Sequence, residues 1–203
     1  MAERPGSTSG RLGVRRVGPA LGLTAYGACP QCGVVVSETN GPVHAYVPSA
    51  PGCWAAFGVL RADEMLRFPG SEANNLAVDA YMAQHPGDGS DRRDRQSVFV
   101  HLVSLCAVIE RGASPSRSPD VLRAVLARHT EFPVLRRTRG PGDQTVLSAT
   151  DAATVGDHDA RVRRWAGSVW DSWREHHPAI RAALDSTYKA ATVPDRGTPP
   201  RCP

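Results

Sequence analysis

The feature that most constrains this chain is a group of three cysteines and one histidine in its N-terminal part. Cys29 and Cys32 are separated by two residues and followed by Gly33, and His44 and Cys53 come next, with 11 and then 8 residues between successive members. A Cys-x-x-Cys turn can place two thiolates about 2.3 Å from a zinc ion on one edge of a tetrahedron, and a glycine after it permits the sharp backbone turn. The spacing therefore predicts a zinc site formed by Cys29, Cys32, His44 and Cys53.

Two other interpretations of these cysteines stay open, a redox dithiol and buried free thiols. The second half of the motif does not match the spacing of a standard zinc finger, and a catalytic metal in the same cluster is a further alternative. Four protein ligands, however, leave no coordination position for a substrate, so a complete set predicts a structural zinc ion. Of the other two cysteines, Cys106 lies in the apolar run "LVSLCAVI" and is expected in the core, whereas Cys202 is expected to be exposed.

Apolar residues recur at helical spacing through most of the chain after Cys53. The regions with this spacing, in order, are "WAAFGVLRADEML", "SEANNLAVDAYMAQH", 94–110, "SPDVLRAVLARH" and a long region from 157 that breaks at Pro178. Residues 132–157 have no regular pattern and are expected to form a loop or a short strand. The sequence thus predicts a mainly α protein, a helical bundle over 54–191 packed as one unit on a small N-terminal zinc-binding lobe at 21–53.

Both ends of the chain, 1–20 and 192–203, are rich in glycine, proline, serine or arginine and are expected to be disordered tails. The formal charge of +4 is spread over the chain and no nucleic-acid-binding motif is present, so a nucleic-acid partner is not expected. No run of about 18 apolar residues is present, which argues against a membrane span. The segment "RRVGPALGLTAYGAC" is only faintly similar to a lipoprotein signal, and we expect a cytoplasmic protein, in which thiols stay reduced. The oligomeric state is left open.

Four residues are candidates for catalysis: Asp79, His85, His101 and His177. Asp79 is flanked by Val78 and Ala80 in an apolar helix, so its carboxylate needs solvent or a partner such as a histidine, an arginine or a metal. The three histidines lie on or at the ends of predicted helices, which can direct such groups to one point in a bundle. If they converge, Asp79 and His101 form an acid/base pair or bind a second metal, with His177 opposite.

Each histidine also has an ordinary structural interpretation. His85 and His177 can be helix C-terminal residues favoured by the helix dipole, and His101 can border an apolar stripe and bond a nearby carbonyl. Three tryptophans in the last helical region are expected in the core, although they could instead form an aromatic wall of a pocket that ends in His177. They are Trp165, Trp170 and Trp173. No nucleophile elbow, phosphate-binding loop or dinucleotide fingerprint is present.

The segments "CPQCG", "GPVHAYVPSAPGCWAAFG", "VDAYMAQHPG" and "RQSVFVHLVSLCAVIERG", with a final helix containing Trp and His-His, resemble a bacterial, largely actinobacterial, family of unknown function. The resemblance covers about residues 28–182 and implies no activity. It implies that the predicted zinc ligands belong to one motif and that four further residues lie in the family's marked segments. Those four are Asp79, His85, Gln96 and His101.

Two classes of function are compatible with these features. The first is a small zinc-containing enzyme of the lyase, cyclase or hydrolase type that acts on a small-molecule substrate in bacterial specialised metabolism, using Asp79 and the histidines. The second is a non-catalytic, zinc-stabilised binding or regulatory module whose arginine-rich surface docks a partner.

Overall fold

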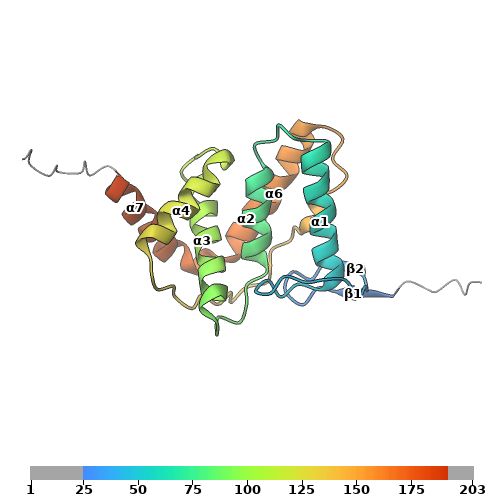
Figure 1. Ribbon diagram of the computed structural model, residues 1–203, viewed down its shortest axis with the longest axis horizontal. Helices are drawn as coiled ribbons and strands as arrows, with labels where there is room; N and C mark the ends of the chain where they lie inside the picture. Colours follow the sequence, from blue (N-terminus) through green and yellow to red (C-terminus); the bar gives the residue numbers. More distant parts are fainter. Residues whose placement is uncertain (1–24, 192–203) are drawn as a thin grey trace, which may run out of the picture.

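The computed structural model describes residues 25–191 and contains seven α-helices and one small two-stranded sheet (Figure 1). The prediction of a mainly α protein is confirmed. The predicted tails at 1–20 and 192–203, and Cys202 with them, lie outside the described residues. None of the helices described is both long and apolar enough to cross a membrane.

The elements follow one another along the chain with short connections, except for the longer ones between β2 and α1 and between α4 and α5. Two 3-10 turns, Pro115–Arg117 and Arg174–His176, precede α4 and α7. The strands and α-helices are β1 Tyr26–Ala28, β2 Val35–Ser37, α1 Pro51–Leu66, α2 Asn74–Gln84, α3 Arg92–Ile109, α4 Ser118–Arg128, α5 Val146–Ala149, α6 Val155–Ser172 and α7 His177–Ala191.

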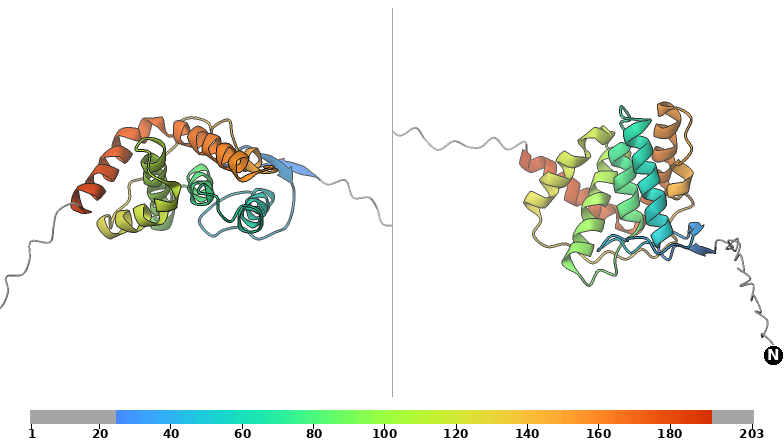
Figure 2. Two further views of the ribbon diagram at one scale, coloured as in Figure 1. Left: turned by 90° about the horizontal axis from the view of Figure 1, so that it is seen from above. Right: turned by 45° about the vertical axis from the view of Figure 1, so that its right-hand side comes forward.

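Helix α2 lies at the centre of the helical part. It packs between α3 and α6, while α3 also contacts α4 and α7, and α1 contacts α5. Helices α1 to α4 stand in a row, with α6 and α7 running across one side of it (Figures 1 and 2). Most of α2 is buried and none of its residues is exposed because neighbours cover it on several sides, so a buried polar side chain on it needs a partner inside the protein.

The N-terminal part is held by an antiparallel hairpin in which Tyr26 pairs with Ser37 and Ala28 with Val35. The Cys-x-x-Cys segment forms the turn between the strands, and Gly33 has a positive φ of 74° there, as expected for a tight turn after the second cysteine. The strands are three residues each, too short for an alternating pattern to be recognised in the sequence.

The apolar residues at helical spacing are only partly buried. In α3, Val98, Leu102 and Leu105 are buried, but Ile109 at the helix end is 38% exposed. In α1, Phe57 and Leu60 face the core, whereas Val59, Met65 and Leu66 are exposed. The tryptophans at 165, 170 and 173 and Cys106 are all buried, as predicted for core residues.

The last helical region breaks before Pro178, not at it. Helix α6 ends at Ser172, a 3-10 turn follows, and Pro178 lies in the first turn of α7. Proline is tolerated there because the first backbone N–H groups of a helix have no partner within the helix. Where residues 132–157 were expected to form a loop or a short strand, the structure has the four-residue helix α5 and, from Val155, the start of α6.

Candidate metal centre and the adjacent groove

Three cysteines and one histidine meet in the interior, and their donor atoms all lie within 4.8 Å of one another. The Sγ atoms of Cys32 and Cys53 are 3.7 Å apart, and the Cys53 Sγ is 3.4 Å from Nε2 of His85. A tetrahedral zinc ion with Zn–S of about 2.3 Å and Zn–N of about 2.0 Å has edges of about 3.8 and about 3.5 Å, so both separations fit. The fourth member of the group is Cys29, and all four side chains are buried. These four residues could hold a metal ion with a closed coordination sphere.

Each of these four residues sits where the backbone turns or where a helix begins or ends. Cys29 and Cys32 lie in the hairpin turn, Cys53 lies in the first turn of α1, and His85 is the C-cap of α2. The site therefore joins the hairpin lobe to the two helices, so it is not contained within residues 21–53.

Hydrogen bonds around the cluster orient its donor atoms. The Ala50 backbone N–H donates to Cys29 Sγ at 3.4 Å. The ring nitrogen Nδ1 of His85 lies 2.8 Å from the Tyr81 carbonyl, so Nδ1 carries the proton and Nε2 is left with a free lone pair directed at the sulfurs. Metal-binding histidines commonly have such a partner on the second ring nitrogen.

The predicted ligand His44 is not in this group, and His85 takes its place. His44 is partly exposed, forms an isolated β-bridge with Val47 and packs against the rings of Tyr46 and Trp54. Local spacing favoured His44 because it lies between the cysteines, but the loop carrying it turns away while the end of α2 returns to the hairpin. The available signal for His85 was its position at the end of a buried helix, directly before Pro86.

The contacts among the three cysteines shift their pKa values in opposite directions. Hydrogen bonds from Cys32 and Cys53 lower the pKa of the Cys29 thiol, whereas hydrogen bonds with Cys29 and Cys32 raise the pKa of Cys53. Arg137, from the long loop after α4, donates to the carbonyl oxygens of Gln31 and Gln84. Its guanidinium thus places a positive charge beside Cys32, although burial lowers the pKa of Arg137.

A second polar cluster lies between α2 and α3, around Asp79. This carboxylate is 1% exposed, with Oδ1 2.7 Å from Nδ1 of His101 and Oδ2 accepting a bond from the Ser104 hydroxyl at 2.6 Å. These two partners satisfy the hydrogen-bonding needs of the buried carboxylate, as expected for a charged group among apolar neighbours. Since Nδ1 of His101 binds Asp79, its Nε2 is the free ring nitrogen.

His101 lines an open groove of about 510 Å³ between α3, α4 and the loop after β2. His44 and Tyr46 line the same groove from that loop, so the histidine excluded from the cysteine cluster lies in the groove with His101. The side chain of His101 is 13% exposed, which makes it the part of the Asp79 cluster that reaches the groove.

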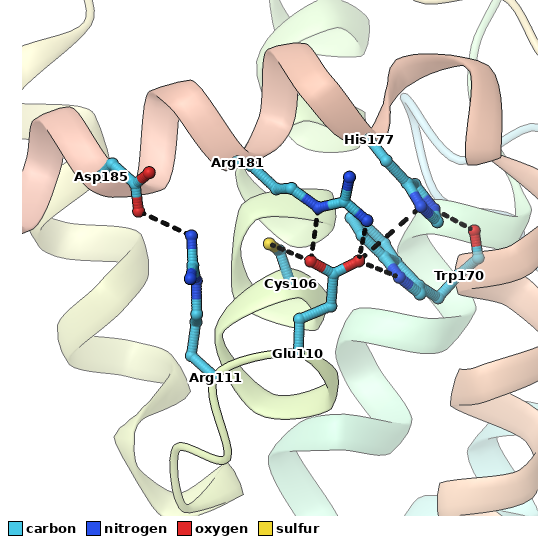
Figure 3. Close-up of polar contacts among 7 residues, drawn as sticks. All are labelled: Cys106, Glu110, Arg111, Trp170, His177, Arg181 and Asp185. Carbon is cyan, nitrogen blue, oxygen red and sulfur yellow. Dashed lines mark hydrogen bonds and ion pairs between the residues drawn. The ribbon is translucent and has the colours of Figure 1, made fainter.

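His177 belongs to a third cluster, drawn in Figure 3. Its ring stacks on Trp170 with centroids 3.7 Å apart and an interplanar angle of 7°, and its Nε2 lies 3.0 Å from the Trp170 carbonyl. Its Nδ1 is 3.7 Å from Glu110, which also accepts two bonds from Arg181, at 2.6 and 2.7 Å, and one from the Trp170 indole. The cluster fastens α7 to α3 and α6.

The structure thus does not bring the four candidate catalytic residues together. Asp79 and His101 form one pair, and His85 lies among the cysteines. His177 binds Glu110, which follows His101 by nine residues and therefore lies about 13 Å from it along the axis of α3. Trp170 is buried and its ring stacks on that of His177. Within residues 25–191, no second group of three Cys, His, Asp or Glu side chains has donor atoms close enough to hold a metal.

The fold and the cluster define a helical protein with a buried Cys3His group that could bind a metal ion. The chain belongs to a family of unknown function, DUF5946, whose family model matches residues 27–174. No curated protein and no solved structure matches the chain. The match covers α1 to α6, β2 and all but the first residue of β1, and therefore includes the cysteine cluster, the Asp79–His101 pair and the groove.

Proposed function

We propose that the Cys29, Cys32, Cys53 and His85 side chains bind a structural zinc ion. Three sulfur donors and one imidazole are a ligand set that zinc prefers, and the Cys32–Cys53 and Cys53–His85 separations fit its tetrahedron. Four protein ligands leave no position for substrate or water, so the role of the metal would be to hold the hairpin, α1 and α2 together.

We further propose that the protein is an enzyme that acts on a small molecule in the groove, with His101 as general acid/base and Asp79 as the residue that orients it. The observation that carries this proposal is the 2.7 Å Asp79–His101 contact at the edge of the groove. A groove of about 510 Å³ is in the size range of small-molecule sites.

The pair has the properties that proton transfer requires. A carboxylate on Nδ1 fixes the tautomer and ring orientation, and it stabilises the imidazolium that forms when Nε2 takes a proton. Ser104 holds the second carboxylate oxygen, which restricts rotation of the Asp79 side chain. Proton transfer at one position is common to the lyase, cyclase and hydrolase reactions that we consider, in a cytoplasmic setting where the thiols stay reduced.

The test uses untargeted mass spectrometry of a small-molecule extract incubated with the purified protein. We expect the wild type to consume at least one metabolite, and His101→Gln to slow that conversion by about 10²- to 10⁴-fold, the usual contribution of a general acid/base. Asp79→Asn should slow it as well, because the amide can present its N–H to Nδ1 and favour the other tautomer. His176→Gln, at a partly exposed histidine that contacts the Arg136 carbonyl, is the matched control and should keep full activity.

The competing function is a non-catalytic binding or regulatory module. It predicts that a metabolite copurifies with or is retained by the wild type and by the folded His101→Gln variant, with no metabolite consumed by either. Conversion that proceeds equally in wild type and His101→Gln would also exclude His101 from catalysis.

A further inference from the structure

We propose that the ligand of the groove carries an oxyanion, a carboxylate or phosphate group, which is bound by Arg93 and Arg92 at the start of α3. This inference rests on the proposed function for the statement that the ligand is a substrate. The binding site itself follows from the charges and contacts of the groove.

The first argument is the charge of the lining. The ionisable side chains that line the groove are Arg92, Arg93, His44, Tyr46 and His101, and none is a carboxylate. Asp79 lies behind His101, and both of its oxygens are already bonded. The Asp91 carboxylate caps α3 by accepting the Arg93 backbone N–H at 2.6 Å, and it is not part of the lining. An anion entering the groove would therefore meet cationic and neutral side chains.

The second argument is that both guanidinium groups are positioned by uncharged partners. Arg92 donates to the Gln96 side chain at 2.8 Å and to the Thr130 carbonyl at 3.0 Å, and Arg93 lies over the Tyr46 ring, 5.5 Å from its centroid. Within the described part of the chain, neither forms an ion pair with a carboxylate. Their charge stays available to a ligand, and a guanidinium can bind a carboxylate or phosphate through two parallel N–H bonds.

The third argument is the apolar part of the groove. Met82, Val100, Leu122 and Leu126 line it together with the polar residues. Such a surface accommodates an apolar body, so the ligand that fits has an oxyanion at one end and an aliphatic or aromatic portion at the other. The oxyanion at Arg92 and Arg93 would fix the position of this body relative to His101.

The test titrates the metal-loaded full chain with benzoate, phenyl phosphate and benzyl alcohol, and follows the imidazole NMR signals of His44 and His101. We expect saturable shifts with one or both anions and none with the neutral alcohol. The anion that binds more tightly shows whether the site is selective for a carboxylate or for a phosphate group. Arg93→Gln should weaken binding about ten-fold or more, because the bidentate contact is lost. Arg123→Gln is the control: it removes an equal charge from an exposed arginine on α4 that pairs with Asp120 and is outside the groove.

The outcomes separate this inference from the proposed function. Equal binding of benzyl alcohol, equal weakening in Arg93→Gln and Arg123→Gln, or the absence of saturable anion binding would each overturn the oxyanion site. If an uncharged metabolite is converted in a His101-dependent way, the enzyme stands and the oxyanion site fails. If anions bind through Arg93 but no metabolite is converted, the oxyanion site stands as a binding site and the enzyme fails. For a converted anion, Arg93→Gln should raise KM with little change in kcat, whereas His101→Gln should lower kcat.

Discussion

The assignment of the fourth metal ligand is open to a direct test by replacing His85 with alanine. The side chain is 1% exposed, its Nε2 lies 3.4 Å from Cys53 Sγ, and its Nδ1 bonds the Tyr81 carbonyl. His85→Ala removes a donor atom from the proposed zinc site. Three sulfur ligands remain, and water must supply the fourth ligand of the metal. We expect the metal to bind more weakly and the folded state to lose the stabilisation that bound metal provides.

The size of the effect follows from linkage between metal binding and folding. Loss of an outer-shell partner typically weakens metal affinity by 10- to 100-fold, so loss of a ligand should cost at least about 100-fold. At saturating metal this corresponds to at least about 2.7 kcal/mol of unfolding free energy, and the lost bond to the Tyr81 carbonyl adds about 1 kcal/mol. In a chain of this size one kcal/mol lowers Tm by about 2–4 °C, so the variant should melt at least about 7 °C below the wild type.

The assay combines metal content per chain by elemental analysis, competition with a chromophoric chelator, and thermal unfolding. His44→Ala is the matched control, because it removes the same imidazole from the same part of the fold but outside the cluster, and it should retain one metal per chain. The opposite pattern, with metal lost in His44→Ala and retained in His85→Ala, would refute the ligand assignment. A wild type without metal whose melting does not respond to added zinc would refute the site altogether.

Three further predictions concern charged residues. Arg137→Gln removes the positive charge beside the thiolates and should weaken metal affinity by about 10- to 100-fold in chelator competition; unchanged affinity would show that the charge has no role. Burial raises the pKa of Glu64 to about 7, above its usual 4.5, so the folded state resists its ionisation. Denaturant unfolding should therefore show the wild type losing about 3 kcal/mol relative to Glu64→Gln as the pH rises from about 4.5 to about 7, and a constant difference would contradict this. Glu110→Gln breaks the paired bonds to Arg181 and should destabilise the chain by about 1–2 kcal/mol, whereas Asp185→Asn, in a single exposed ion pair, should cost under about 0.5 kcal/mol.

The helical architecture was predictable because apolar periodicity, helix starts and Gly or Pro stops are local signals. The α3 stripe of Val98, Leu102 and Leu105 follows that periodicity and is buried. Met65 and Leu66 break the rule because the buried face of α1 runs through Cys53, Phe57, Leu60 and Glu64, so a carboxylate takes the inner position and the two apolar residues after it are exposed. The break between α6 and α7 lies before the predicted position because a proline is compatible both with the end of a helix and with the first turn of the next one.

The candidate site was partly predictable for a related reason. Cys29 and Cys32 are close in sequence, so their proximity in space is fixed by one turn, whereas the pairing of Cys53 with His85 depends on how α2 packs, which no local spacing encodes. Asp79 was recognisable because a carboxylate in an apolar helix demands a partner. That its partner is His101 depends on how α2 and α3 pack against each other, which the sequence does not specify.

Helix α2 connects the metal cluster to the groove, so the proposed structural metal can affect the Asp79–His101 pair through this helix. Asp79 lies six residues before His85 on this helix, and Met82 between them lines the groove. Gln84, next to the metal cluster, bonds the Trp165 indole and two carbonyls of the long loop, so the end of α2 is held from several directions. Loss of the metal would remove one of these constraints, the one at His85, and would give the last turn of α2 more freedom less than two turns from the Asp79 carboxylate. Metal removal should therefore loosen the Asp79–His101 contact before the fold as a whole is lost, and the metal would support catalysis without contacting the substrate.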